Sequence, residues 1–398
     1  MIPVAEAQQR LIEGIKPLGV EQVTLNEALG RVLAEDLVAR RTQPPWAVSA
    51  MDGYAVRAAD VEKVPVRLKV IGAVPAGQAY SGAVKAGEAV RIFTGAPLPE
   101  GTDCIIIQED TERQDDIVEV REGAPKGTYV RPAGLDFSEG DVGLKAGRRL
   151  SFSDVGFAAA MNRPWLTVYR RPRVAILPTG DEVVMPGDRV GPHQIVSSNG
   201  IALSALVTSC GGVPIHLPIA PDDSASLQRI ATGAAGADLL LTTGGASVGE
   251  HDLVRGALSA DGLTIDFWSV AMRPGKPLMV GRYRDTPMIG LPGNPVSTLV
   301  CGLLFAKPAL ERMSGIENVF PNPMRARLKV PLAVNDRRQD YLRSTMTRAA
   351  DGTIEVEPFK KQDSSMISLL ARADCLVIRA PHAESAKPGD WVEILPIS

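Results

Sequence analysis

The segment 239–252 contains residue types suited to phosphate chemistry, because a short apolar run ends there at paired glycines and acidic residues follow. Glycine permits positive φ and brings backbone N–H groups close to a ligand, since it has no Cβ. Backbone N–H groups between a strand and a helix bind oxyanions. We therefore expect Gly244, Gly245 and Ser247 to bind a phosphate group. Ser247 and Glu250 also have the spacing of a capping box, so the same residues can simply begin a helix.

Carboxylates after other predicted strands are suited to holding a divalent cation beside that phosphate. Loops that follow parallel strands meet at one edge of the sheet, and Mg²⁺ prefers one or two carboxylates together with phosphate and water oxygens. Asp222 and Asp223 are explained equally well as caps of a helix predicted from Ser224. The ligand candidates are Asp181, Glu182, Asp222, Asp223 and Asp252.

Two proline-rich segments, 272–277 and 290–297, are predicted to bind a second oxyanion. Proline fixes φ and lowers the conformational entropy that is lost on binding, so Lys276 is a positive charge held in a preset position. Ser297 lies near the start of a predicted helix, where its hydroxyl and the free N–H groups suit an anion. Capping of that helix accounts for a serine at this position about as often.

Asp52 lies in a third loop, 49–55, whose other residues are mostly small or apolar. A carboxylate in such surroundings is unusual. The simpler explanation is an Asp-Gly turn, because Asp tolerates turn geometry and Gly53 supplies backbone freedom.

The elements that must position these loops alternate as strand, loop and helix from residue 173 onward. This alternation predicts a mostly parallel sheet covered by helices on both faces, which binds ligands at the carboxyl ends of its strands. The predicted strands are 174–177, 213–219, 238–242, 267–270 and 287–291, and the predicted helices are 199–210, 224–235, one from Ser247, and 296–313.

The remaining sequence predicts further domains around this α/β domain. Helices are expected over 4–16, 24–38 and 154–161, short β-prone runs fill 64–120, and strand-like segments joined by turns follow residue 318. The fold class is therefore α/β with additional β domains. The predicted division is 1–44 with 142–170 as a helical linking and dimerisation domain, 45–141 as an inserted β-rich module, 171–317 as the α/β domain, and 318–398 as a C-terminal β-barrel.

Composition excludes several classes of function. The 43 Lys and Arg residues nearly balance 46 Asp and Glu in a chain of 398 residues, so we expect neither nucleic acid nor a membrane surface as a partner. The four cysteines contain no C-x-x-C pair and are expected to be reduced, mostly buried thiols. The first 15 residues do not resemble a secretory signal, and the apolar stretch 296–306 is too short to cross a bilayer. We therefore expect a cytoplasmic protein.

Six motifs in order along the chain resemble those of the molybdopterin molybdenumtransferases, which complete molybdenum cofactor synthesis and are related to the C-terminal domain of gephyrin. The resemblance implies an elongated four-domain homodimer that binds adenylylated molybdopterin and molybdate. It also implies Mg²⁺-dependent cleavage that releases AMP and leaves molybdenum on the dithiolene. The motifs are Ser49–Ala55, Ile92–Pro99, Pro178–Glu182, Thr243–Asp252, Arg273–Pro277 and Leu291–Ser297.

The resemblance also implies roles for individual residues. Glu182 and Asp252 would position Mg²⁺ and the pyrophosphate, with Asp222 or Asp223 as a further acidic ligand. The inserted module would reach toward the partner subunit, so that the active site is composite. The catalytic residues would be Asp52, Glu182, Asp252 and Lys276, and the substrate contacts Thr94, Asp136, Thr179, Gly244, Gly245, Ser247, Pro292, Pro295, Ser297, Arg343 and Ser365.

Molybdate, a tetrahedral dianion, would lie near Lys276, Ser297, Arg343 and a serine of 363–366, with Ser365 favoured. Many relatives carry Lys where this chain has Arg273, so charge is retained while hydrogen-bond geometry changes and the role of Arg273 is left open.

Two alternative functions are weighed against this one. The first is adenylylation of molybdopterin, since the α/β domain is shared with the molybdopterin adenylyltransferase; the extra domains and the Asp52 loop argue against it. The second is a non-catalytic dimeric scaffold that binds a partner protein, although such a scaffold would not require the acidic and basic site residues.

Overall fold

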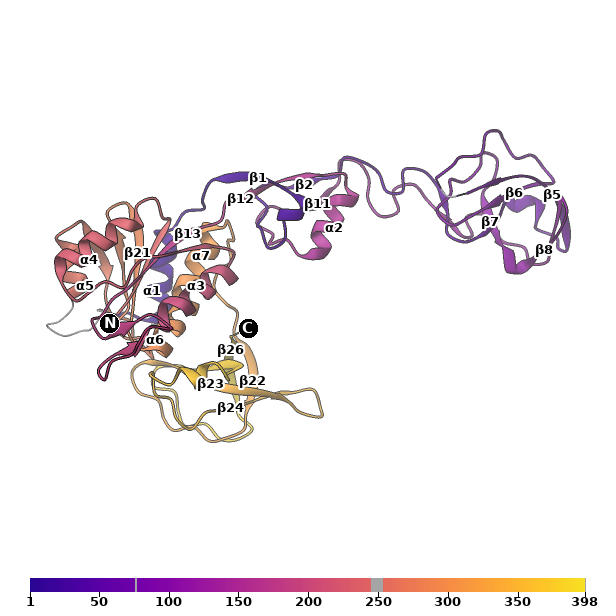
Figure 1. Ribbon diagram of the computed structural model, residues 1–398. Helices are drawn as coiled ribbons and strands as arrows, with labels where there is room; N and C mark the ends of the chain where they lie inside the picture. The colour runs from indigo at the N-terminus through magenta and orange to yellow at the C-terminus, as the bar shows by residue number, and fades with distance from the viewer. Residues whose placement is uncertain (76, 245–252, 398) are drawn as a thin grey trace. The chain divides into compact units, whose positions relative to one another are not determined.

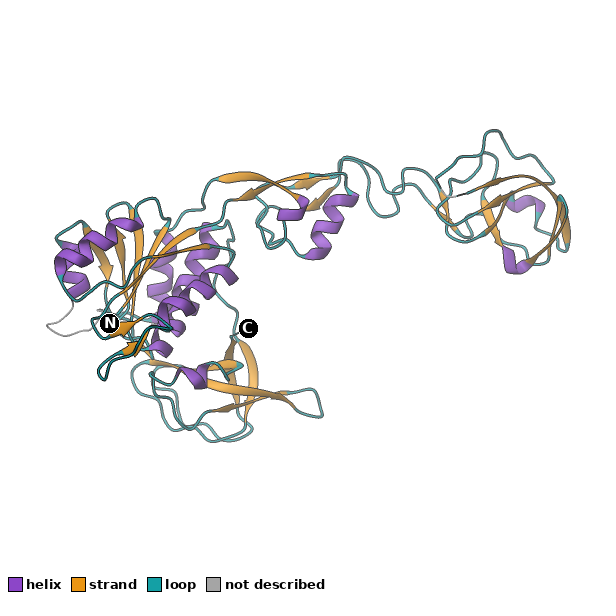
Figure 2. Cartoon of the chain, in the orientation of Figure 1, coloured by secondary structure: helices purple, strands orange, loops and turns teal. Residues whose placement is uncertain are grey.

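A computed structural model describes residues 1–75, 77–244 and 253–397 of the chain. The chain divides into two compact units, drawn in Figures 1 and 2. The first unit comprises Met1–Glu21, Gly30–Ala34 and Val168–Ser398, and the second comprises Gln22–Leu29 and Glu35–Thr167. This division does not test the predicted four-domain boundaries, which stay a prediction.

The α/β domain of the first unit is built on a mixed sheet with the strand order β16-β13-β17-β21-β20-β18. The first four strands are parallel and the last two join the edge antiparallel. The central strands are buried along their length, as the near-continuous apolar runs of a sheet covered on both faces require. The strands are β13 (Arg173–Pro178), β16 (Val213–His216), β17 (Leu239–Thr243), β18 (Leu263–Phe267), β20 (Met279–Tyr283) and β21 (Thr286–Leu291).

Helices cover both faces of this sheet, which gives the predicted three layers (Figure 1). One face is covered by α1 (Val4–Glu13), α3 (Asn199–Ser209), α6 (Pro295–Cys301) and α7 (Lys307–Met313). The other is covered by α4 (Ser224–Ala231), with the short η4 (Thr232–Ala234), and by α5 (Leu253–Ser259). The helix predicted over 296–313 forms with a π-helical turn, η5 (Gly302–Ala306), between α6 and α7. Pro308 follows that turn, and a proline has no N–H for the regular helical bond, which accounts for the irregularity.

The two helices predicted in the N-terminal 40 residues have different outcomes. Helix α1 forms, and its Val4, Ala7 and Leu11 pack in the same core cluster as the α/β sheet. The helix predicted over 24–38 is wrong: a single 3-10 turn, η1 (Leu25–Glu27), is followed by β2 (Leu37–Val38). The capping box of Thr24 and Glu27 is present, but Gly30 adopts φ +74°, and left-handed backbone at that point ends helical structure.

The C-terminal strands of the first unit form a closed five-stranded barrel, as predicted. The ring closes because β23 pairs with both β24 and β25. A short strand of the α/β domain, β19 (Met272–Arg273), pairs in parallel with the start of β23 and joins the two domains. The barrel strands are β22 (Met324–Leu328), β23 (Gln339–Arg348), β24 (Ile354–Pro358), β25 (Cys375–Arg379) and β26 (Trp391–Pro396), with α8 (Ile367–Leu370) between β24 and β25.

The second unit contains the β-rich segment expected over 64–120, with the strand order β7-β4-β6-β5-β9-β8. Its strands are β4 (Gly53–Val56), β5 (Val66–Val74), β6 (Glu88–Ile92), β7 (Cys104–Ile107), β8 (Thr111–Gln114) and β9 (Ile117–Val120), with the 3-10 turns η2 (Ala58–Asp60) and η3 (Gln108–Asp110). Shorter elements are β3 (Val48–Ser49), β10 (Val130–Arg131), β11 (Val142–Leu144) and α2 (Phe152–Ala160), the last of which was predicted. The strands β1 (Val20–Thr24) and β12 (Trp165–Tyr169) pair and run through the boundary between the units, and β14 (Val183–Val184) pairs with β15 (Ile195–Val196) in the first unit.

The fold class is thus confirmed as multidomain α/β with additional β domains. All four cysteines are buried, as expected. None of the helices in the described part of the chain has the length and apolar character needed to cross a membrane.

Candidate active site

A cavity of about 1200 Å³ lies at the carboxyl ends of β13, β17 and β21 and extends to the C-terminal barrel. This is the edge at which open α/β sheets bind ligands. We call it the main cavity. Its lining includes Thr179, Gly180, Glu182, Asp222, Gly244, Arg273, Gly275, Lys276, Pro292, Gly293, Asn294, Ser297, Arg338, Gln362, Asp363 and Ser364.

Close backbone packing shapes one wall of the main cavity. Gly244 adopts φ +94°, and a Cβ on it would lie 2.6 Å from the carbonyl oxygen of Thr179. Only glycine therefore fits this position, as its predicted role requires. Thr179 itself is only 4% exposed, and its hydroxyl has no hydrogen-bond partner among the described residues. A buried hydroxyl without a partner is uncommon in native structures and calls for an explanation, such as a function at this wall of the cavity. Gly245 and Ser247 lie outside the described residues.

The predicted acidic ligands have different environments. Glu182 and Asp222 line the main cavity. Asp181 and Asp222 bond reciprocally, since each carboxylate accepts a hydrogen bond from the other residue's backbone N–H, at 3.0 and 3.4 Å. Asp223 caps α4: its carboxylate accepts the N–H of Ser226 at 2.8 Å, which lowers the pKa of Asp223. The capping interpretation therefore holds for Asp223.

Metal ligation stays a prediction. Asp252 lies outside the described residues. Within residues 1–75, 77–244 and 253–397, no group of three or more His, Cys, Asp or Glu side chains is arranged to hold a metal ion.

Lys276 and Ser297 both reach the main cavity, as the sequence predicted for an oxyanion site. Lys276 is half-buried, and among the described residues no ion pair forms at its amine. The preceding Gly275 adopts φ +112°, and a Cβ there would lie 2.4 Å from Sγ of Cys301, so the loop packs tightly on α6. Ser297 is the third residue of α6 and is buried, and Pro295 occupies the first position of the helix, which suits proline. Pro292 lines the cavity.

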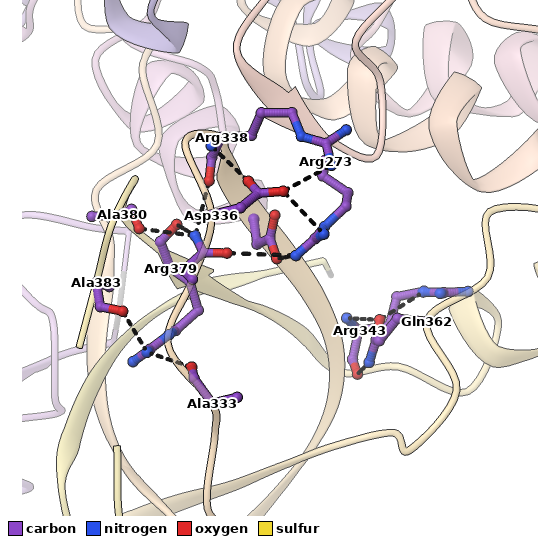
Figure 3. A network of polar contacts seen from close by, with 11 residues as sticks. Arg273, Ala333, Asp336, Arg338, Arg343, Gln362, Arg379, Ala380 and Ala383 are labelled. Carbon is purple, nitrogen blue, oxygen red and sulfur yellow. Dashed lines mark hydrogen bonds and ion pairs between the residues drawn. The ribbon is translucent and has the colours of Figure 1, made fainter. Parts of the chain in front are cut away.

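Arg273 differs from Lys276 because its charge is already paired (Figure 3). Its guanidinium forms ion pairs with Asp340 and, at 3.4 Å, with Asp336, both from the barrel. Asp340 is buried, and burial raises its pKa although Arg273 opposes this shift. Arg273 therefore links the α/β domain to the barrel through these ion pairs.

The structure does not bring every predicted molybdate ligand to the cavity wall. Arg343 is 1% exposed, and it lies behind Gln362, whose side-chain oxygen accepts its Nε–H at 3.2 Å (Figure 3). Burial lowers the pKa of Arg343. Ser365 donates its hydroxyl hydrogen to Asp363 at 2.6 Å, whereas Ser364 lines the cavity. Gln362 and Ser364 thus occupy the positions at the wall that the sequence assigned to Arg343 and Ser365.

Sequence reasoning missed several cavity residues. Gln362 and Arg338 come from the barrel, where no glycine or proline motif marked them. Asn294 donates to Oγ of Ser364 at 2.8 Å and could have been found, because it lies inside the motif Leu291–Ser297. Asn199 was recognised only as the start of a helix, yet its side chain bonds to Thr243 and Gly293.

In the second unit, two of the three predicted site residues meet. One carboxylate oxygen of Asp52 accepts both the N–H and the hydroxyl of Thr94, at 2.7 and 2.8 Å, and these bonds lower the pKa of Asp52. Gly53 is required for packing, since a Cβ there would lie 1.9 Å from the carbonyl oxygen of Ile106. Asp136 lies on another loop, is exposed, and donates its backbone N–H to Gln43.

Three family descriptions match successive parts of the chain. They are the MoeA N-terminal region, domains I and II, at residues 2–162; a probable molybdopterin binding domain at 175–312; and the MoeA C-terminal region, domain IV, at 325–397.

Relatives match along nearly the full length. The chain is 32% identical to the molybdopterin molybdenumtransferase of Haemophilus influenzae, with 100% of this chain and 99% of the relative covered. It is 36% identical to the enzyme of that name from Nostoc sp., with 89% of this chain and 81% of the relative covered. The crystal structure of the molybdopterin biosynthesis MoeA protein from Pyrococcus horikosii matches with a TM-score of 0.84 and 32% identity, covering 100% of this chain and 99% of that one.

The α/β fold, the cavity at its strand ends and the matched domains define an enzyme of molybdenum cofactor biosynthesis. The regions on either side of the α/β domain match the MoeA N-terminal and C-terminal regions, and the relatives match along the whole chain, so the class of enzyme can be defined more closely. The chain belongs to the molybdopterin molybdenumtransferase family.

Proposed function

We propose that this enzyme transfers molybdenum from molybdate to adenylylated molybdopterin, with Mg²⁺-dependent release of AMP. The observation that carries the proposal is the main cavity, where Lys276 and Ser297 share one space with Glu182, Asp222 and the backbone at Gly244. A tetrahedral dianion needs cationic and hydroxyl groups, and a pyrophosphate needs backbone donors and a cation. The cavity supplies groups of both kinds.

Lys276 and Ser297 are the proposed molybdate ligands. The amine of Lys276 forms no ion pair among the described residues, so its charge is available to an oxyanion. Ser297 adds a hydroxyl from the first turn of α6. On this view Arg343 orients Gln362 at the cavity wall and does not itself contact molybdate.

The acidic residues at the wall fit Mg²⁺ in their chemistry, because carboxylates and phosphate oxygens are its preferred ligands. We propose that Glu182 and Asp222 hold the ion, with Asp252 as a further ligand. When bound, Mg²⁺ would neutralise charge that develops on the cleaved pyrophosphate. The residues of the chain orient the substrate: Gly244 allows close approach and Thr179 offers its unpaired hydroxyl.

We also propose a cytoplasmic homodimer in which the active site is composite. Asp52 holds one carboxylate oxygen toward Thr94, and for its other oxygen no hydrogen bond forms among the described residues. That oxygen is available to a substrate bound mainly by the other subunit.

The decisive experiment incubates purified protein with adenylylated molybdopterin, molybdate and Mg²⁺ and measures AMP by chromatography and cofactor by reconstitution of a molybdoenzyme. We expect AMP release to require both molybdate and Mg²⁺. A parallel reaction contains ATP and molybdopterin. Efficient AMP transfer there would favour the adenylyltransferase, and no turnover in either reaction would favour the scaffold.

A further inference from the structure

Asn199, the first residue of α3, lies between two loops that line the main cavity. Its side-chain amide donates one hydrogen bond to Oγ1 of Thr243 at 3.0 Å and another to the carbonyl oxygen of Gly293 at 2.7 Å. Thr243 ends β17, and Gly293 lies between β21 and α6. A single side chain from a third element therefore bonds to both loops.

These two loops pack against each other with little space between them. A Cβ on Gly293 would lie 3.6 Å from Cα of Gly244, and the Thr243 hydroxyl contacts the carbonyl oxygen of Pro292 at 3.4 Å. On its other side, Gly244 packs on Thr179. Small shifts in either loop would therefore change the positions of the backbone groups that face the cavity.

The remaining polar atom of Asn199 supports a role beyond that of an ordinary helix start. Its side-chain oxygen is buried and accepts no hydrogen bond among the described residues. The residue before it, Ser198, makes no side-chain cap bond to α3 either. An unsatisfied buried oxygen is a cost to folding, so stability alone does not favour asparagine at this position, and its two donated hydrogen bonds are the feature that needs an explanation.

We propose that Asn199 is a positioning residue for the substrate's phosphate: it fixes the distance between the Gly244 and Gly293 backbones at which that phosphate binds. The proposal deepens the proposed function and rests on it. Asn199 acts through Thr243 and Gly293 and does not contact the substrate.

The test compares Asn199→Ala, Asn199→Asp and a matched control, Gln8→Ala. Gln8 also donates a side-chain amide hydrogen bond to a backbone carbonyl of the α/β domain, that of Leu304 at 2.9 Å, but neither residue lines the main cavity. The readouts are kcat/KM and KM for adenylylated molybdopterin, the melting temperature, and hydrogen exchange of peptides covering 239–244 and 291–298 without substrate.

We expect kcat/KM of Asn199→Ala to fall about 10- to 100-fold, mainly through KM, because two hydrogen bonds that position the loops are lost. The kcat/KM of Asn199→Asp should fall at least as far, since a carboxylate has no hydrogen to donate to the carbonyl oxygen of Gly293. Exchange should rise in the two loop peptides of both variants, whereas Gln8→Ala should leave kcat/KM and those peptides unchanged. Unchanged kcat/KM with a lowered melting temperature would overturn the proposal, because the role of Asn199 would then be structural.

The exchange measurement separates this proposal from the proposed function. If the wild type releases no AMP, yet exchange in Asn199→Ala rises only in the two loop peptides, the link between the loops is supported and the proposed function fails. If the wild type is active and Asn199→Ala matches it in both readouts, the positioning role is wrong and the function stands.

Discussion

The main cavity and the Asp52 surface of the second unit show two ways in which site residues are held. In the main cavity, residues far apart in sequence converge on one open cleft, and Lys276 has no anionic partner among the described residues. In the second unit, Asp52 is partly exposed, and one neighbour, Thr94, donates both hydrogen bonds to its carboxylate. Under the proposed function, the cavity binds the oxyanion with groups of one chain, whereas Asp52 acts on a substrate that is held mainly by a second surface.

The largest expected effect on activity comes from Lys276 and tests anion binding in the main cavity. Lys276→Met should lower kcat/KM about 100- to 1000-fold, because a charged donor to an oxyanion in a sheltered site contributes roughly 3–4 kcal/mol. The measurement is AMP release at saturating Mg²⁺ over a range of molybdate concentrations. Lys307→Met, at an exposed position of α7, is the matched control. Equal activities of the two variants would remove Lys276 from the site.

The next largest effect tests whether the charge of Asp52, in the second unit, is needed for AMP release. Asp52→Asn keeps an oxygen that accepts the Thr94 hydrogen bonds, so the fold should persist while the charge is lost. We expect AMP release to fall about 10- to 100-fold, which is less than the roughly 100- to 1000-fold typical of losing a whole transition-state donor, because the amide oxygen of Asn is retained. Asp116→Asn, at an exposed turn of the same unit, should retain full activity.

A mixed dimer sharpens this comparison. When Asp52→Asn and Lys276→Met chains are combined equally, a composite site would restore about a quarter of wild-type activity, since half of the dimers then carry one intact site. A site formed within one chain would give no recovery.

A smaller effect on activity and a larger one on stability are expected at Arg273. Arg273→Ala leaves the buried Asp340 without its partner, which should cost about 1–3 kcal/mol of unfolding free energy after allowing for the half-exposed guanidinium. Unfolding in denaturant measures this change in unfolding free energy. Adding Asp340→Asn to Arg273→Ala should recover most of the lost stability.

The loss of unfolding free energy in Arg273→Ala should depend on pH, because it arises from the charge of the Asp340 carboxylate. Burial raises the pKa of Asp340, and removing Arg273 raises it further, so the folded state binds a proton more readily than the unfolded state. The stability deficit of Arg273→Ala should therefore shrink as pH falls toward the pKa of Asp340. A deficit that grows on acidification would contradict this assignment.

The smallest expected effect distinguishes the roles of the adjacent residues Asp222 and Asp223. Asp223→Ala removes the cap of α4 and should lower the melting temperature slightly without changing the Mg²⁺ dependence of AMP release. Asp222→Asn should raise the Mg²⁺ concentration needed for half-maximal rate. The pKa of Asp223 is lowered by Ser226, so its contribution to stability is present above the ordinary aspartate pKa and is lost as pH falls through the lowered value. If both Asp222→Asn and Asp223→Ala changed the Mg²⁺ dependence of AMP release, both residues would be assigned as Mg²⁺ ligands.

The sequence predicted the four parallel strands of the α/β sheet because they are apolar and are followed by loops. It placed a further strand over 267–270, where β18 ends at Phe267, and it missed β20. The strand 238–242, the helix 199–210 and the cavity positions of Lys276, Ser297 and Gly244 could all be derived from such patterns. The helix over 24–38 was predicted from the capping box, although Gly30 in its middle is a residue type at which helices end; the structure has only η1, which ends at Glu27, and Gly30 is left-handed.

Other residues could not be assigned from sequence because one residue type serves two purposes. Asp222 and Asp223 have the same chemistry, and only the bond to Ser226 shows which one caps α4. Arg343 fits the charge of a molybdate ligand, but its place on β23 puts Gln362 between it and the cavity. Spacing along a barrel strand does not reveal which side chain lies in front.

The closed ring of the C-terminal barrel has a consequence for self-association. Each of its described strands, β22 to β26, has a hydrogen-bonded neighbour on both sides. Open strand edges are where one chain adds a strand to another chain's sheet and begins to aggregate. The barrel should therefore resist fibril-like stacking even at high expression, because its strands offer no free edge to which another chain could add a strand.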